Sequence, residues 1–248
     1  MRQNNIGNVH SIETFGAFDG PGVRYIVFLQ GCPFKCQFCH NRDTWSTREN
    51  TLMSVEEIVA DYKKYEKFYT KGGITVSGGE PLLQTPFLIE LFKAFKKMGV
   101  HTTIDTSAAC YDVRRSAEFR ELMKYTDLVL LDIKQINDEK HKILVGQSNK
   151  RVLEFAKFLE ELNVKVNTRH VLVPGVNNDP EDLKELRRFL DSLNNIVKID
   201  VLPYHTKGKV KWEQLGFTYP LDGVEEPTKE EVHIAETILK DNYNYMQE

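Results

Sequence analysis

The sequence lacks several features that would mark other classes of protein. It has only 4 cysteines in 248 residues, and none of its apolar runs approaches the roughly 18 residues of a membrane span. Its 33 basic and 36 acidic residues are mixed along the chain, without the basic stripe that nucleic-acid binding usually needs. The N-terminal stretch MRQNNIGNVHSIETFG has neither the apolar core of a signal peptide nor an acid-poor transit helix. We therefore expect a cytoplasmic protein with no membrane segment and no nucleic-acid partner.

Nothing in the sequence divides the chain into parts. It contains no Gly/Ser/Pro-rich linker, no low-complexity tract and no repeated motif of fixed length. A chain of this size buries about 70 to 75% of the surface that its unfolded form exposes, which is enough for one core. We predict a single domain over residues 1–248.

Short apolar runs alternate with longer amphipathic stretches. The runs predict strands over residues 23–29, 74–77, 101–106, 128–133, 164–173 and 197–203. The stretches predict helices over residues 55–69, 85–97, 113–124, 153–162, 180–193 and 229–242. This alternation predicts a parallel sheet covered by helices. Distinctive polar residues follow every predicted strand, which favours strands arranged around a common mouth over an open sheet with one binding crevice.

Three of the four cysteines lie in the stretch GCPFKCQFCHNRDTW, directly after the first predicted strand. Cys32, Cys36 and Cys39 form a C-x3-C-x2-C pattern, which in a reducing compartment favours a metal or redox centre over disulfides. A structural zinc site would need His40 or Cys110 as its fourth ligand. The C-x-x-C-H of c-type haem attachment is also present, but it belongs to exported proteins and leaves Cys32 without a role. The pattern best fits an iron-sulfur cluster with three thiolates and one open iron, because clusters for electron transfer alone take four cysteines.

Further motifs accompany the cysteines. They are DGPGVR (19–24), CHNRDTW (39–45), SGGEPLLQ (77–84), DLVLLDIKQIND (127–138), LVGQSN (144–149), LPYH with GKVKW (202–212) and LDGV (221–224). Together with the three cysteines they resemble the radical S-adenosylmethionine superfamily, and within it the activating enzymes of glycyl radical enzymes. The resemblance extends from about residue 10 to the last predicted helix.

This resemblance implies both a fold and a reaction. The fold is a partial (β/α)6 TIM-like barrel, with parallel strands and outer helices. The cofactors are a 4Fe-4S cluster on Cys32, Cys36 and Cys39, and S-adenosylmethionine bound to the fourth iron. In the family, an electron from the cluster cleaves S-adenosylmethionine, and the 5′-deoxyadenosyl radical takes a hydrogen atom from one glycine of a partner enzyme.

The resemblance also implies the residues of the site. The expected contacts of S-adenosylmethionine are Phe38, Cys39, His40, Gly78, Gly79, Glu80, Asp132, Ile133, Lys134 and His205. Lys134 joins the three cysteines as a catalytic residue. A monovalent cation is expected at Asp105, Asp132 and the Leu130 carbonyl, and Asp19 is a candidate for binding the substrate protein.

Taken by themselves, these residues allow ordinary structural explanations. SGGE and DGPG are typical turn sequences. Asp132 and Lys134 stand at i and i+2, which on a strand places them on one face, where they would form a salt bridge at the rim. His205 would be a structural histidine, and Cys110 an idle or buried thiol. The segment DTSAAC (105–110) also departs from the Asp-Thr-Asn-Gly usual in the family, so no role is expected for that Asn-Gly turn.

The interval between the cysteines and SGGE narrows the choice of partner. Activating enzymes of several other glycyl radical enzymes carry a cysteine-rich insertion there, whereas this interval has no cysteine and is mainly one predicted helix. The short form favours pyruvate formate-lyase as partner, with a relative such as 2-ketobutyrate formate-lyase as the alternative. The resemblance further implies reduced flavodoxin or ferredoxin as electron donor and a monomeric state. From another class, a zinc-stabilised binding module or an electron carrier would need neither SGGE nor the Asp132–Lys134 pair.

Overall fold

The computed structural model describes residues 4–246 of the chain. The chain consists of two compact units, which we describe one at a time. Unit 1 comprises Met1–Pro33 and Thr44–Leu130, and unit 2 comprises Phe34–Asp43 and Leu131–Glu248. Within residues 4–246, no helix is long and apolar enough to cross a membrane.

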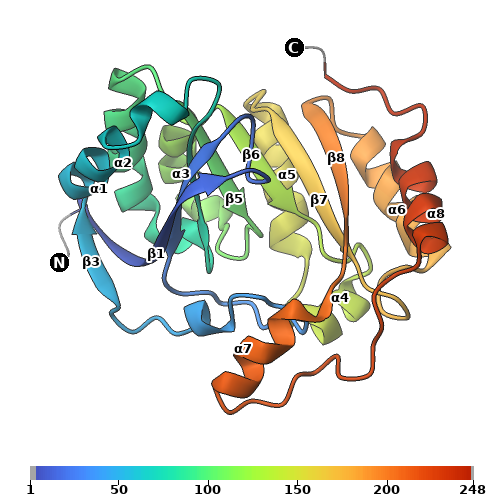
Figure 1. The fold of residues 1–248 in the computed structure, drawn as a ribbon. Helices are drawn as coiled ribbons and strands as arrows, with labels where there is room; N and C mark the ends of the chain where they lie inside the picture. The colour runs from blue at the N-terminus through green and yellow to red at the C-terminus, as the bar shows by residue number, and fades with distance from the viewer. Residues whose placement is uncertain (1–3, 247–248) are drawn as a thin grey trace. The chain divides into compact units, whose positions relative to one another are not determined.

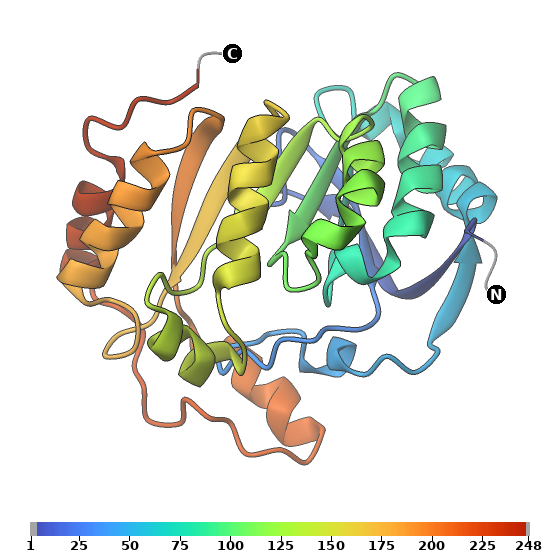
Figure 2. The same cartoon turned by 180° about the vertical axis from the view of Figure 1, so that it is seen from behind.

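Unit 1 contains the first part of the sheet. Its elements are β1 (Ile6–Gly16), β2 (Arg24–Leu29), β3 (Thr51–Ser54), α1 (Val55–Lys63), β4 (Gly73–Gly78), α2 (Thr85–Lys97), β5 (His101–Thr106), α3 (Ser116–Met123) and the start of β6 (Leu128–Asp132). β2, β4 and β5 are parallel neighbours, whereas β1 pairs antiparallel with both β2 and β3 (Figure 1). Figure 2 shows α2 and α3 on the same face of these strands.

Unit 2 contains the end of the sheet. Its elements are the end of β6, α4 (Asp138–Val145), α5 (Lys150–Glu161), β7 (Val166–Leu172), α6 (Pro180–Asp191), β8 (Ile196–Pro203), α7 (Lys209–Gln214) and α8 (Lys229–Lys240). β7 and β8 are parallel. Helix α5 lies over β7 in Figure 2, and α8 packs against α6 and β8.

The sheet has the predicted character. Its strands follow the order β3-β1-β2-β4-β5-β6-β7-β8, so β3 and β8 are its two ends and the sheet does not close. The six predicted strands and six predicted helices are all present, and most of their ends lie within three residues of the prediction. The helix predicted over 55–69 is the exception, because α1 ends at Lys63 and a separate 3-10 turn follows at Glu66–Phe68. A mostly parallel α/β sheet that stays open confirms the fold class of a partial barrel.

The sequence prediction missed two strands, β1 and β3. In β1 the apolar residues Ile6, Val9, Ile12 and Phe15 recur every third position, which hides the alternation expected of a strand. The pairing with β2 shifts register twice along β1, and each irregularity resets which side chains face the core. β3 is only four residues long, too short to give a periodic signal.

Helices α4 and α7 were also missed because both are short. α4 has clear end signals: the Asn137 side chain accepts a hydrogen bond from Lys140 N, and Gly146 ends the helix in the left-handed conformation. Its apolar residues gather at the C-terminal end, however, so no helical period is visible. The LVGQSN motif begins at the C-terminal end of α4, and the GKVKW motif covers most of α7.

Candidate active site

In unit 2, the cysteine segment 34–43 is fixed on one side by the end of α4. The Lys35 amide donates to the Val145 carbonyl at 2.8 Å, and the Gln37 amide donates to the Leu144 carbonyl at 3.0 Å. Backbone bonds of this kind do not depend on which side chains are present. The first two residues of the LVGQSN motif therefore supply the carbonyls that hold the backbone on either side of Cys36.

The other side of the segment contacts α7 and the turn before it. The Trp212 indole N–H donates to the Cys39 carbonyl at 2.8 Å. A Cβ on Gly208 would lie 2.6 Å from His40 Cδ2, so only glycine allows this approach. Lys211 Nζ lies 3.2 Å from the Asp43 carboxylate. The GKVKW motif thus holds the segment that follows Cys39, a role that sequence reasoning did not assign.

Cys36 is buried close to a cation. Burial raises the pKa of its thiol to about 12, while the positive charge of Lys134 lowers it. The Lys134 ammonium also lies 5.2 Å from the centre of the Phe38 ring. Burial therefore outweighs the cation and favours the neutral thiol, while the Lys134 charge offsets part of the cost of forming the thiolate that a metal ligand requires.

The predicted pair of Asp132 and Lys134 is in direct contact. Lys134 Nζ lies 2.8 Å from Asp132 Oδ2, and Arg169 Nε lies 3.8 Å from Asp132 Oδ1. Burial raises the pKa of Asp132, but the two cations outweigh it, so the net shift is downward. The Lys134 side chain is 10% exposed and the Asp132 side chain is 21% exposed. The pair is therefore largely buried and is not a salt bridge at the rim. Arg169 was missed, although a charge in the middle of the strand sequence VNTRHVL was a signal.

Two further side chains fix the backbone of this pair. His170 Nδ1 donates to the Ile133 carbonyl at 2.8 Å, and Asn177 Nδ2 donates to the Lys134 carbonyl at 2.9 Å. Both donors are buried. Asn177 belongs to the VPGVNN segment after β7, so this loop sets the position of Lys134.

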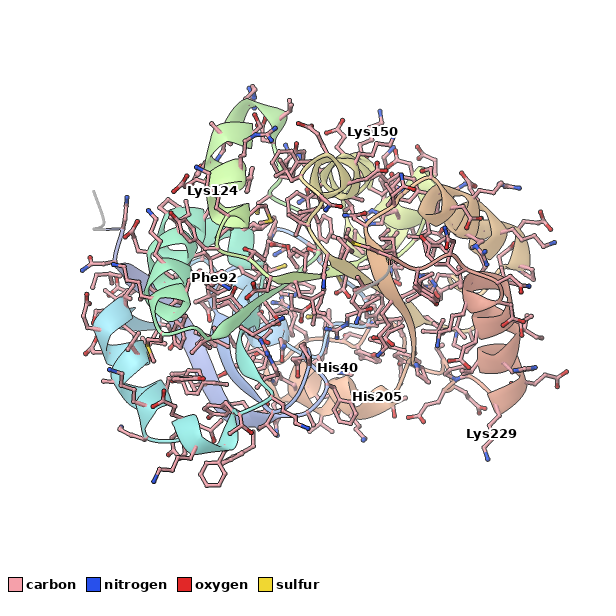
Figure 3. The ribbon with its side chains drawn as sticks, turned by 90° about the horizontal axis from the view of Figure 1, so that it is seen from above. His40, Phe92, Lys124, Lys150, His205 and Lys229 are labelled. Carbon is pink, nitrogen blue, oxygen red and sulfur yellow. The ribbon has the colours of Figure 1, made fainter. Side chains whose placement is uncertain are left out.

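His40 and His205, both predicted cofactor contacts, lie side by side (Figure 3). Their ring centres are 4.2 Å apart, and His40 Nε2 lies 3.4 Å from the His205 carbonyl. Burial, followed by the nearby His205, lowers the pKa of His40. His205 Nδ1 is buried and finds no hydrogen-bond partner within residues 4–246. A buried ring nitrogen in this condition indicates a place where a ligand or water would bind.

In unit 1, Cys32 follows the end of β2 after two intervening residues and is half-buried. Its amide lies 3.4 Å from the Trp45 carbonyl, and the preceding Gly31 amide donates to the Thr44 carbonyl at 2.7 Å. Gly31 has a φ of +104°, a conformation that side chains disfavour. The chain therefore leaves the strand through a glycine turn whose backbone bonds set the direction of Cys32.

Gly78 and Gly79, at the end of β4, are required by close backbone contact. A Cβ on Gly78 would lie 2.2 Å from Leu29 N, and one on Gly79 would lie 2.2 Å from Gly31 O. Gly79 also donates its amide to the Leu29 carbonyl at 2.9 Å. The two glycines thus allow the SGGE turn to lie against the start of the cysteine loop. Their predicted contact with S-adenosylmethionine remains a prediction.

Glu80 is fully buried and accepts hydrogen bonds within unit 1. One carboxylate oxygen accepts from Leu82 N at 3.0 Å and Thr106 Oγ1 at 2.5 Å. The other accepts from the amide and hydroxyl of Ser107, at 3.0 and 2.6 Å. The carboxylate therefore links the end of β4 to the end of β5. The contact expected between Glu80 and the cofactor remains a prediction.

The other predicted residues of unit 1 are Asp19, Asp105 and Leu130. Ser77 Oγ donates to Asp105 Oδ2 at 2.7 Å at the ends of β4 and β5, and Leu130 is buried in β6. The Asp19 carbonyl accepts from the Thr75 hydroxyl at 2.6 Å. No three His, Cys, Asp or Glu side chains within residues 4–246 are arranged to hold a metal ion, so the cation site remains a prediction.

Cys110 is half-buried, in the segment where this chain departs from Asp-Thr-Asn-Gly. Ala108 stands where the family has glycine and adopts a φ of +54°. Its amide bonds to Thr106 Oγ1 at 2.8 Å, which helps to hold this disfavoured conformation.

Comparison with known proteins places this geometry in a family. The model described as the Radical SAM superfamily matches residues 26–190. The pyruvate formate-lyase-activating enzyme of Listeria monocytogenes is 50% identical over 241 residues, which cover 95% of this chain and 96% of that enzyme. The enzyme of the same name from Staphylococcus epidermidis is 49% identical, over 92% of this chain and 93% of that enzyme.

The chain belongs to the pyruvate formate-lyase-activating enzyme family of the radical SAM superfamily. Solved structures agree with this assignment. A domain of the pyruvate formate-lyase-activating enzyme of Bacteroides vulgatus has a TM-score of 0.57 and 28% identity, and the match covers 71% of this chain and 98% of that one. Streptococcus suis SuiB bound to its precursor peptide SuiA has a TM-score of 0.65 at 18% identity, over 89% of this chain and 46% of that one. The second likeness, at 18% identity, shows the fold alone.

Proposed function

We propose that this protein activates pyruvate formate-lyase by forming a radical on one of its glycines. The observation that carries the proposal is the identity of 50% to an activating enzyme over 95% of this chain and 96% of that enzyme. A match over nearly the whole of both proteins leaves little room for a different architecture, and loops that follow strands carry the working residues in folds of this type. The short, cysteine-free interval before SGGE supports the same partner.

Cys32, Cys36 and Cys39 would hold a 4Fe-4S cluster. Cys36 supports this assignment because its thiol is buried near the Lys134 ammonium, whose charge offsets part of the penalty that burial places on the thiolate that an iron ligand requires. When bound, the reduced cluster supplies the electron that cleaves S-adenosylmethionine into methionine and the 5′-deoxyadenosyl radical that abstracts the glycine hydrogen. The chain itself positions the ligands through α4 and through Trp212.

S-adenosylmethionine carries an ammonium, a carboxylate and a sulfonium, so its site needs charges of both signs. Lys134 provides a cation for the carboxylate, and Asp132 provides an anion for the positive groups. The glycine turn at Gly78 and Gly79 offers backbone groups to the ammonium. The buried Nδ1 of His205 offers a hydrogen-bonding group that the described residues do not use. Together with Phe38, His40, Glu80 and Ile133, these residues form the proposed cofactor site.

Several finer assignments extend the proposal. A monovalent cation would bind at Asp105, Asp132 and the Leu130 carbonyl, and Asp19 would contact the partner's glycine segment. Reduced flavodoxin or ferredoxin would donate the electron. The protein would act as a cytoplasmic monomer with one functional domain, without nucleic acid.

Anaerobic purification and assay test the function. We expect about four irons per chain, and 5′-deoxyadenosine when dithionite and S-adenosylmethionine are added. Cys36→Ala should abolish both iron binding and cleavage, whereas the control Cys110→Ala should keep both. One zinc per chain without cleavage would instead indicate a metal-stabilised binding module.

The partner is tested separately by electron paramagnetic resonance. Pyruvate formate-lyase and 2-ketobutyrate formate-lyase are each incubated with the reduced protein and S-adenosylmethionine. We expect the glycyl radical to form faster on pyruvate formate-lyase. A faster reaction on the other enzyme would reassign the substrate and leave the radical chemistry in place.

A further inference from the structure

Arg24, the last residue of the DGPGVR motif, is completely buried in unit 1. Its guanidinium makes five hydrogen bonds to three carbonyls and two hydroxyls. The acceptors are Thr75 Oγ1 (2.9 Å), Pro21 O (3.2 Å), Ile74 O (2.5 Å), His101 O (3.3 Å) and Thr103 Oγ1 (2.9 Å). Burial lowers the pKa of Arg24 to about 10, so the group remains charged at neutral pH. Burying a charge costs free energy that a well-packed apolar residue would not require. The reason for an arginine at this position therefore lies in the groups to which its guanidinium donates hydrogen bonds.

The guanidinium holds the Asp19–Gly22 loop (residues 19–22) along two routes. The direct route is the bond from Nη1 to the Pro21 carbonyl. The second is a relay, in which Arg24 Nε donates to Thr75 Oγ1 and the same hydroxyl donates to the Asp19 carbonyl at 2.6 Å. Both routes end on backbone carbonyls, so neither uses the Asp19 carboxylate.

Glycines allow the loop to lie this close to the strands. Gly20 and Gly22 have φ values of +129° and +67°, which disfavour any side chain. A Cβ on Gly22 would lie 2.0 Å from the Lys71 carbonyl, and one on Gly73 would lie 3.1 Å from Arg24 Nη1. The loop therefore has one backbone path, and Arg24 and Thr75 fix it.

We propose that Arg24 and Thr75 are positioning residues that orient the Asp19–Gly22 loop toward the glycine segment of the partner enzyme. This inference rests on the proposed function, in which Asp19 contacts that segment. It assigns to the arginine of the motif a role in recognising the protein substrate rather than in cleaving S-adenosylmethionine.

The test compares two isosteric variants of unit 1. Thr75→Val breaks the relay to the Asp19 carbonyl, whereas the control Thr103→Val removes one acceptor of the same guanidinium and no bond to the loop. Each cluster-loaded variant is assayed for S-adenosylmethionine cleavage without partner, and for glycyl radical formation over a range of pyruvate formate-lyase concentrations. Arg24→Lys is assayed in the same way, because lysine keeps the charge but cannot form the fork of bonds.

For Thr75→Val and Arg24→Lys, we expect the KM for pyruvate formate-lyase to rise about tenfold, the size expected for losing one charge-assisted hydrogen bond. Partner-free cleavage should stay within about twofold of the original, and Thr103→Val should change the KM much less. An unchanged KM in Thr75→Val would overturn the proposal, as would equal effects of Thr75→Val and Thr103→Val. A parallel loss of cleavage and activation in Thr75→Val would also overturn it, since that pattern indicates a general structural role.

A double variant supplies an independent check. If Arg24 acts through the loop, Asp19→Ala combined with Arg24→Lys should raise the KM no more than the stronger single variant does. If the double variant raised the KM by the product of the two single effects, the proposal would be contradicted. Failure of the proposed function itself is distinguishable, because the unmodified protein would then form no 5′-deoxyadenosine.

Discussion

The Lys134 ammonium lies 2.8 Å from the Asp132 carboxylate, and the Arg169 guanidinium lies 3.8 Å from the same carboxylate. One acidic group in unit 2 therefore contacts two cations. The ammonium of this pair also acts on the buried Cys36 thiol, whose pKa it lowers against the effect of burial.

Asp132→Asn should destabilise the protein and weaken S-adenosylmethionine binding. The change leaves the largely buried Lys134 without its partner, which costs about 2 to 3 kcal/mol, toward the lower end for buried pairs because Asp132 retains some exposure. Anaerobic urea denaturation measures the loss, and isothermal titration measures the affinity. Glu181→Gln serves as control, since it removes an exposed ion pair with Lys184. Equal stability of the two variants would show that the Asp132 pair is not structurally important.

Glu80→Gln should destabilise unit 1 by about 2 kcal/mol, because an amide nitrogen would face hydrogen-bond donors that now point at a carboxylate oxygen. The donors affected belong to Leu82, Thr106 and Ser107. Urea denaturation measures the change. Glu90→Gln, an exposed carboxylate paired with Lys93, provides the control. If Glu80→Gln were as stable as the original protein, the hydrogen bonds from Glu80 to the end of β5 would not contribute to stability.

Acidification should destabilise the protein partly through His141. Burial lowers the pKa of His141 below its usual 6.5, while its Nδ1 donates to the Gln147 carbonyl. As the pH falls below 6.5, the unfolded chain takes up a proton that the folded chain resists, so stability is present above that pH and is lost below it. Urea midpoints at several pH values should therefore fall more steeply for the original protein than for His141→Gln. If the urea midpoints of the two proteins fell equally with decreasing pH, His141 would not contribute to the loss of stability in acid.

Trp212→Phe should leave the cluster assembled but make it more labile. The variant keeps most of the ring packing and loses the N–H bond to the Cys39 carbonyl, a loss of about 1 kcal/mol. The rate of bleaching in air, followed by absorbance, should increase severalfold. Val210→Ala on the same helix changes an exposed side chain and should bleach at the original rate. Equal rates for both variants would mean that the indole bond does not protect the cluster.

The sequence alone determined the chemistry and the order of the parallel elements. The spacing of Cys32, Cys36 and Cys39 is a local property, and so are the glycines of SGGE, because a turn needs particular residues at particular positions. β2 and β6 were visible because strands buried on both faces are rich in apolar residues. β5 and β7 contain more polar residues, and their β-branched Thr, Val and Ile residues favoured the strand prediction. Asp132 and Lys134 could be paired in advance because they are only two positions apart.

Only the tertiary structure decided the contacts between distant segments. β1 escaped prediction because two irregularities in its pairing with β2 conceal its alternation, and pairing is not a property of one strand. Nothing in the sequence near Glu80 indicates that Ser107 would occupy its carboxylate, nor near Cys39 that Trp212 would bind its carbonyl. Arg24 is the clearest case: its charge suggests a surface residue, and only the fold gathers three carbonyls and two hydroxyls around it. Side-chain chemistry is set locally, whereas the desolvation and hydrogen bonding that give it a role depend on segments brought together by folding.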